Sequence, residues 1–165
     1  AAHFEKKAAK AAAEKERAEA LSNAKVLKIV GASMAAMFTI MQGFILYSAY
    51  MEAHVNASQS HADIGKVSCI LAGAVLIILG NYMPKAKKNH IVGVRISWSM
   101  YNDTTWMKSN LFGGVATIIA GLLIIVTTVF VRSALAVVLL LVYILAATVI
   151  TLIYSHKIYR AEGSL

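Results

Sequence analysis

Four residues between the first two apolar segments have side chains that could bind a divalent metal ion. They are Glu52, His54, His61 and Asp63. The Glu-x-His and His-x-Asp spacings could supply the carboxylate oxygens and imidazole nitrogens that zinc and related metals accept. The segment has no cysteine, and its histidines lack the i, i+4 spacing of a helical metal site. We interpret these residues as solvated loop residues and expect no cofactor, with metal binding as the alternative.

The remaining residues offer no set suited to catalysis. The sequence shows no nucleophile paired with a base, no glycine-rich phosphate loop and no paired carboxylates. Gly113-Gly114 is isolated, and close helix packing explains it better than phosphate binding. The single cysteine, Cys69, cannot form a disulfide within the chain and lies in an apolar segment, where it is expected to be buried. We predict that the protein is not an enzyme.

Four long apolar segments surround these residues. Hydrophobic residues make up 59% of the 165 positions and charged residues only 15%, which is too apolar for an ordinary soluble domain. About 20 apolar residues are enough for a helix to cross a bilayer. Blocks of 18 to 24 residues without Asp, Glu, Lys or Arg occupy 29–51, 67–84, 109–131 and 133–156. We predict an all-α, polytopic membrane protein, a four-helix bundle with spans at about 26–51, 64–83, 109–130 and 133–156.

Residues 1–25 differ from the rest of the chain in being rich in Ala, Glu, Lys and Arg. These residue types favour a solvated helical arm that runs toward the first span. Ser22 or Asn23 could cap a break, so one continuous helix and two separate helices are both open. A partner-binding or coiled-coil arm is the alternative, although Leu and Ile are absent at heptad spacing. The membrane domain then covers 26–158.

The distribution of Lys and Arg predicts the orientation in the membrane. Basic residues gather in the N-terminal arm, in the 84–108 loop and in the C-terminal tail. The 52–66 connection contains only Lys66, and the last turn only Arg132. Because basic segments stay in the cytoplasm, both termini and the 84–108 loop are expected on the cytoplasmic side of the plasma membrane. The net charge of +8 then reflects topology and anionic lipid, with no direct nucleic-acid binding.

The predicted spans contain few polar residues that could take part in transport. Gln42 and Asn81 are the candidates, and structural hydrogen bonding across the bundle explains them better than a transport role. A small permease or ion pathway is nevertheless one alternative. A structural subunit of a larger membrane complex is another, docking through small residues of the first span, and a homo-oligomer is also open.

The 84–108 loop is the most distinctive segment. It contains both tryptophans, Trp98 and Trp106, and only one acid, Asp103. Its basic residues are Lys85, Lys87, Lys88, Arg95 and Lys108. Anchoring at the lipid headgroups is one interpretation. The loop also holds many apolar residues, so an ordered platform that recognises a partner is the other.

The order of residues in this region resembles the signature of the SdpI family of toxin-immunity membrane proteins, over about residues 66–158. Matching positions are Gly80-Asn81-Tyr82-Met83-Pro84-Lys85, Asn89, Gly93-Val94-Arg95, Trp98, Trp106, Lys108 and Gly113-Gly114. The family's Thr-Pro before the first tryptophan is Ile96-Ser97 here, and its Thr-His after the second is Ser109-Asn110. The departures at Ser97 and Asn110 could change the partner.

The resemblance implies an integral membrane immunity protein that protects a cell against a secreted peptide toxin. It also implies a sensing role in which the protein sequesters a cytoplasmic transcriptional repressor. Many relatives carry a further N-terminal membrane domain, and residues 1–25 could mark its attachment point. The implied partner-binding surface comprises Asn81, Pro84, Lys85, Asn89, Gly93, Arg95, Trp98, Trp106 and Lys108.

Overall fold

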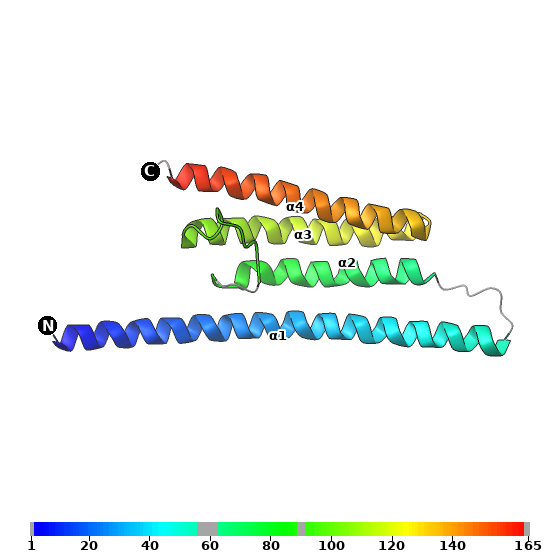
Figure 1. Ribbon diagram of the computed structural model, residues 1–165, viewed down its shortest axis with the longest axis horizontal. Coiled ribbons are helices and arrows are strands. Elements are labelled where there is room, and N and C mark those ends of the chain that lie inside the picture. Colours follow the sequence, from blue (N-terminus) through cyan, green and yellow to red (C-terminus); the bar gives the residue numbers. More distant parts are fainter. Residues whose placement is uncertain (1, 56–62, 89–91, 164–165) are drawn as a thin grey trace.

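The structure is a computed structural model that describes residues 2–55, 63–88 and 92–163. These residues form four α-helices and one short 3-10 helix, and no strand occurs among them. The elements are α1 (Ala2–Val55), α2 (Ile64–Tyr82), η1 (Met83–Lys85), α3 (Asp103–Phe130) and α4 (Ser133–Gly163). The helices lie side by side in chain order, and each runs antiparallel to its neighbour (Figure 1). The prediction of an all-α bundle is confirmed.

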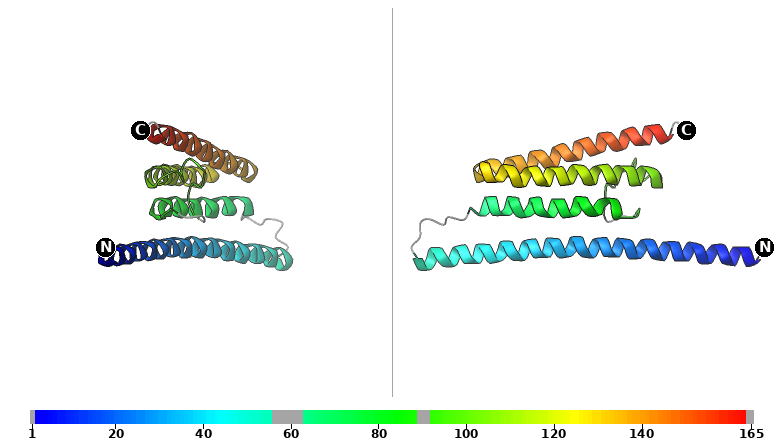
Figure 2. Two further views of the ribbon diagram at one scale, coloured as in Figure 1. Left: turned by 60° about the vertical axis from the view of Figure 1, so that its left-hand side comes forward. Right: turned by 180° about the vertical axis from the view of Figure 1, so that it is seen from behind.

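Each of the four helices is long and apolar enough to cross a membrane. The protein is therefore a multi-pass membrane protein, as its composition predicted. Both ends of the chain lie at the same end of the bundle as the connection between η1 and α3 (Figures 1 and 2). We call this the loop end. The short connection between α3 and α4 lies at the opposite end, which we call the turn end.

The helix α1 is continuous from the charged arm through the first span. Its 54 residues extend for about 80 Å at 1.5 Å per residue, so it projects beyond the other helices (Figure 1). Ser22 and Asn23 do not cap a break, because their side chains contact the loop instead. From that contact to its C-terminal end, α1 is largely exposed. An added Cβ at Gly31 or Gly43 would meet no atom of another element within 4 Å.

Glycines bring α2 and α3 unusually close together. A Cβ added at Gly80 would lie 2.5 Å from the carbonyl oxygen of Gly114, and one at Gly114 would lie 2.5 Å from that of Gly80. A second crossing pairs Gly73 with Gly121, where an added Cβ would lie within 2.9 Å of the opposite carbonyl oxygen. Small residues allow such backbone approach between membrane helices. The interpretation of Gly113-Gly114 as a packing site therefore holds for Gly114, and it holds for Gly113 too, where an added Cβ would lie 2.8 Å from Val94 Cγ2.

The three helices α2, α3 and α4 share an apolar core near the turn end. Its buried centre is Cys69, Ile124 and Ala136, so the cysteine is a small buried residue as predicted. The chain passes from α3 to α4 through Val131 and Arg132 alone, so a tight turn joins these two antiparallel helices. The Val131 N–H donates to the carbonyl of Thr127 (3.1 Å), which closes the end of α3.

The ends of two helices differ from the boundaries that we predicted for the spans. The helix α3 begins at Asp103 rather than near 109, because Asn102 and Thr105 form a capping box at its start. Trp106 and Lys108, which the sequence placed in the loop, therefore lie on the first two turns of α3. The helix α4 likewise continues past 156 to Gly163. Pro84 follows the end of α2 within η1, as expected for a residue that cannot continue a helix.

Candidate functional site

The predicted signature residues gather at the loop end. They are distributed over α2 and η1 (Asn81, Pro84, Lys85), the connection to α3 (Gly93, Arg95, Trp98) and the start of α3 (Trp106, Lys108). Asn89 lies outside the described residues. Asn81 is exposed and, like Gln42, makes no hydrogen bond to another described residue. The hydrogen bonding that we expected of these two side chains across the bundle is therefore not seen within the described chain.

The side chain of Asn110 fastens the connection to α3. Its Oδ1 accepts a hydrogen bond from the Val94 N–H at 2.7 Å, and its Nδ2 donates to the carbonyl of Trp106 at 2.9 Å. Asn110 is only 1% exposed, so both bonds are shielded from water. Gly93, just before Val94, has φ +110°, and a Cβ on it would overlap Asn110 Oδ1. The backbone conformation and the close contact therefore require glycine at this position.

Trp106 joins α3 to the backbone at Ala86, the residue that follows η1. Its ring is 4% exposed, and its Nε1–H donates to the carbonyl of Ala86 at 3.0 Å. A buried indole N–H needs such a partner. Trp98 behaves differently, since it is 38% exposed and its ring lies over His156 of α4 with centroids 4.6 Å apart. One tryptophan is thus a structural anchor and the other lies at the surface.

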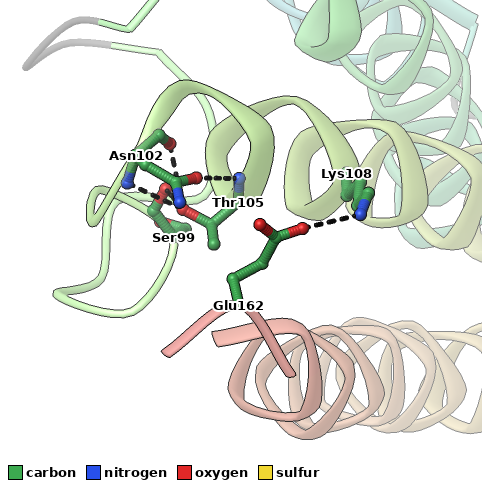
Figure 3. A network of polar contacts seen from close by, with 5 residues as sticks. All are labelled: Ser99, Asn102, Thr105, Lys108 and Glu162. Carbon is green, nitrogen blue, oxygen red and sulfur yellow. Dashed lines mark hydrogen bonds and ion pairs between the residues drawn. The ribbon is translucent and has the colours of Figure 1, made fainter. Parts of the chain in front are cut away.

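A compact turn precedes α3 and is held by small polar side chains (Figure 3). Ser99 Oγ–H donates to the carbonyl of Val94, and the Ile96 N–H donates to Ser99 Oγ at 3.2 Å. Thr105 N–H then donates to Asn102 Oδ1 at 2.6 Å, while Asn102 N–H donates to Thr105 Oγ1 at 3.0 Å. Ser99 and Thr105 are fully buried. The turn is therefore an ordered part of the fold.

The C-terminal half of α4 supports this turn from the side. Tyr101 meets Tyr159 edge to face with centroids 5.1 Å apart. Lys108 Nζ and Glu162 Oε1 form an ion pair at 2.9 Å (Figure 3). Deeper in the bundle, the hydroxyls of Ser109 and Ser155 share a buried hydrogen bond at 2.8 Å. Ser109 stands where the family has threonine, so another hydroxyl residue is retained there.

The helix α1 covers the opposite side of the connection. Asn23 Oδ1 accepts from the Lys87 N–H at 2.9 Å, and Ser22 Oγ–H donates to the Lys85 carbonyl at 3.3 Å. On the next turns of α1, Val26 and Val30 pack against Ala86 in a small apolar cluster. The arm and the first span are thereby joined to the signature segment.

A polar groove of about 560 Å³ lies between the arm and the connection. Lys85, Lys87 and Lys88 line it, and Glu19 and Asp103 add two acids. Its apolar lining residues include Met100, Trp106 and Met107. Lysines over an apolar floor are suited to an anionic partner segment that also has apolar side chains. Lys85 also places its Nζ 4.4 Å from the centroid of the Tyr82 ring, which restrains it on the groove wall.

The weak metal candidates are not brought together within the described chain. Asp63 caps the start of α2, since its Oδ1 accepts from the N–H groups of Gly65 (3.0 Å) and Lys66 (3.3 Å). His61 lies outside the described residues, as does the side chain of His54. Among the residues that the structure describes, no three His, Cys, Asp or Glu side chains are placed to hold a metal ion.

Sequence reasoning identified Gly93 and Trp106 but missed other residues that hold the site together. Asn110 was noticed only as a departure from the family pattern, and Ser99 was not singled out. The spacing of Asn102 and Thr105 is a capping-box pattern that could have placed the start of α3 correctly. The arm contact through Asn23 had no local signal, because its partner is 64 residues away.

The fold and the site define a multi-pass, all-α membrane protein with an ordered segment between its second and third spans. Residues 85–155 match the sequence profile of the SdpI/YfhL protein family, so this region is an SdpI/YfhL family region and the resemblance is confirmed. The chain is also similar to the Immunity protein SdpI of Bacillus subtilis (strain 168), with 30% identity over 92 residues. That match covers 56% of this chain but only 44% of the relative. No solved structure matches the chain significantly.

Proposed function

We propose that the protein is an integral membrane immunity protein that confers resistance to a secreted peptide toxin. The similarity to a protein named as an immunity protein carries this proposal, and the match of residues 85–155 to the family profile adds to it. The structure supports it in one respect. Signature residues Gly93 and Trp106 hold a specific loop geometry, as expected if that geometry serves the function.

We further propose that the loop end faces the cytoplasm of the bacterial cell. The loop end carries the basic arm, the connection and the C-terminal tail, whereas the turn between α3 and α4 has only Arg132. Positive segments remain inside, so this arrangement supports cytoplasmic termini. Single cysteines at Ser97 and Ser133 in a Cys69→Ser background would test it with a membrane-impermeant maleimide. Labelling of position 133 but not position 97 in intact cells is expected, and the reverse pattern would refute the orientation.

In this orientation the toxin and a cytoplasmic partner meet different parts of the protein. The toxin would engage the turn end and the exposed span of α1, while the lysine-lined groove would hold an anionic segment of a transcriptional repressor. The helix α1 connects the two, since it runs along the edge of the bundle from one end to the other and contacts the groove wall through Ser22 and Asn23 (Figure 1). A displacement of α1 by toxin would therefore change the groove. This is the basis on which we propose sensing in addition to immunity.

The immunity proposal is tested in the source bacterium without knowing the toxin. The gene is deleted, and growth is measured in medium conditioned by the intact strain, with and without a complementing copy. We expect the deletion strain to grow poorly and the copy to restore growth. Equal growth of all three strains would refute immunity. The variant Gly93→Val, with membrane levels checked by immunoblot, should restore growth less well than Gly31→Ala.

The sensing proposal needs a separate measurement. Genes beside this one are expected to encode a small secreted peptide and a DNA-binding regulator, and these supply the probes. The regulator, fused to a fluorescent protein, should move to the membrane when the peptide is added. Charge reversal of Lys85 and Lys88 to Glu should abolish this movement and leave growth protection intact. A regulator that stays in the cytoplasm under toxin would refute sensing without affecting the immunity proposal.

A further inference from the structure

A crevice of about 360 Å³ lies between α2, α3 and α4, directly beneath the connection. Its volume is in the range of small-molecule sites, about 300–1,000 Å³. Leu76, Ile144 and Leu152 are among its apolar walls, and Arg95 and Ile96 border it at the loop end. The crevice therefore reaches from the middle of the bundle to the level of the signature loop.

The threonine hydroxyls in the walls already donate hydrogen bonds to carbonyl groups of their own helices. Thr117 Oγ1–H donates to the carbonyl of Gly113 at 2.7 Å, and Thr151 Oγ1–H donates to that of Ala147 at 2.7 Å. Thr148 makes the same bond to Ile144 at 2.8 Å. These hydroxyl protons are used within the helices, so the walls offer little hydrogen bonding to an occupant. A peptide backbone would leave its amides unsatisfied there, whereas a hydrocarbon chain would not.

Among the residues that the structure describes, Arg95 is the only charged one that lines the crevice. It is exposed, and it makes no hydrogen bond or ion pair with another described residue. A guanidinium group binds phosphate through two parallel N–H donors. Because Arg95 stands at the loop end of an apolar crevice, a suitable occupant combines a hydrocarbon chain with an anionic phosphate.

We propose that this crevice binds one anionic phospholipid from the leaflet at the loop end, with an acyl chain between the helices and its phosphate on Arg95. This goes beyond toxin immunity and holds for either orientation of the protein. A second crevice provides an internal comparison. It has a volume of about 240 Å³ between α3 and α4, and its described lining residues, such as Phe112 and Ile150, are all uncharged. It should accept lipid chains without preference for a headgroup.

The headgroup is tested by native mass spectrometry of the full chain, delipidated in mild detergent and titrated with phosphatidylglycerol or phosphatidylcholine of matched chains. We expect one phosphatidylglycerol to bind in preference. Arg95→Gln should weaken that binding about fivefold, the effect of one basic side chain at an anionic surface. Arg132→Gln removes the same charge at the turn end and should leave phosphatidylglycerol binding unchanged. Equal binding of both lipids by the unaltered chain would overturn the proposal, as would equal effects of the two substitutions.

The position of the acyl chain is tested with a matched pair of substitutions on α4. Thr148→Phe fills the proposed crevice, and Ala146→Phe places the same ring in the second one. Only Thr148→Phe should reduce phosphatidylglycerol binding severalfold, and soluble glycerol 3-phosphate should not bind measurably. Circular dichroism and gel filtration establish that each variant is folded. Undiminished binding by folded Thr148→Phe would show that the lipid sits elsewhere and would overturn the proposal. If that variant fails to fold, the comparison of Arg95→Gln with Arg132→Gln still decides it.

Discussion

Gly93 and Asn110 lie in direct contact, with the glycine Cα against the amide oxygen of the asparagine. Gly93 has φ +110°, and the Val94 N–H that follows it donates to Asn110 Oδ1 at 2.7 Å. The loop can approach α3 this closely because position 93 has no side chain. The asparagine in turn holds the loop in the conformation that only glycine adopts readily. Each residue therefore depends on the other.

Substitution of Gly93 by alanine should destabilise the protein strongly. A positive φ costs a non-glycine residue about 1–2 kcal/mol, and the added Cβ would also overlap Asn110. We expect a clear fall in the melting temperature in detergent. Gly31→Ala is the matched control, because no atom of another element lies within 4 Å of its added Cβ. Comparable melting temperatures for the two variants would contradict the described loop geometry.

Replacement of Asn110 tests the other half of the contact. Asn110→Leu leaves the Val94 N–H buried without an acceptor, which should cost about 1–3 kcal/mol of folding free energy. Asn110→His restores the residue of the family pattern, and a ring nitrogen could accept the same hydrogen bond. We expect the histidine variant to retain more stability than the leucine variant. Chemical denaturation in mixed micelles measures the difference, and the opposite ranking would refute this role.

The spans could be predicted from the sequence because long apolar blocks and flanking charge are local signals. The start of α3 was placed too late, near 109, although Asn102 and Thr105 are a local capping signal, because Trp106 and Lys108 belong to a basic, aromatic stretch that is typical of an interfacial loop. The buried ring of Trp106 shows why the interpretation of this stretch as an interfacial loop was incomplete. Its indole N–H donates to the carbonyl of Ala86, which lies 20 residues earlier.

The composition of the site was predictable, but its internal arrangement was not. The family resemblance identified Gly93, Arg95 and both tryptophans from their order alone. It could not show that Trp98 lies against His156, because that contact arises only when α4 packs beside the loop. Sequence reasoning also left open whether Ser22 and Asn23 break α1. Their bonds to the loop are long-range contacts, for which propensity carries no information.

The two tryptophans should respond differently to substitution. Trp106→Phe removes the donor to the Ala86 carbonyl and leaves that acceptor buried, which should cost about 1–3 kcal/mol. Trp98→Phe keeps an aromatic ring at an exposed position and should have little effect on stability. The variants also isolate one fluorophore each. Emission from Trp106 should be blue-shifted and resist iodide quenching, whereas emission from Trp98 should be quenched.

The glycine crossing between α2 and α3 should tolerate no side chain. Gly80→Val places branched carbons where even a Cβ would lie 2.5 Å from the carbonyl of Gly114, so the helices must separate. We expect loss of at least about 1–3 kcal/mol, the usual cost of overpacking. Gly43→Val is the control, because position 43 on α1 has no neighbouring element within 4 Å. A purified Gly80→Val protein as heat-stable as this control would contradict the close approach.

The ion pair between Lys108 and Glu162 should contribute little to stability, despite its short distance of 2.9 Å. The side chains are 47% and 24% exposed, so water and salt screen their attraction. Exposed pairs contribute about 0–1 kcal/mol. Lys108→Glu alone should therefore lower the melting temperature only slightly, and the exchange of both charges, Lys108→Glu with Glu162→Lys, should restore it. A double-mutant cycle at low and high salt measures this coupling. A coupling well above 1 kcal/mol that persists in high salt would mean that the pair is shielded in the membrane-bound protein, as it would be if a lipid headgroup or a partner covered this end of α4.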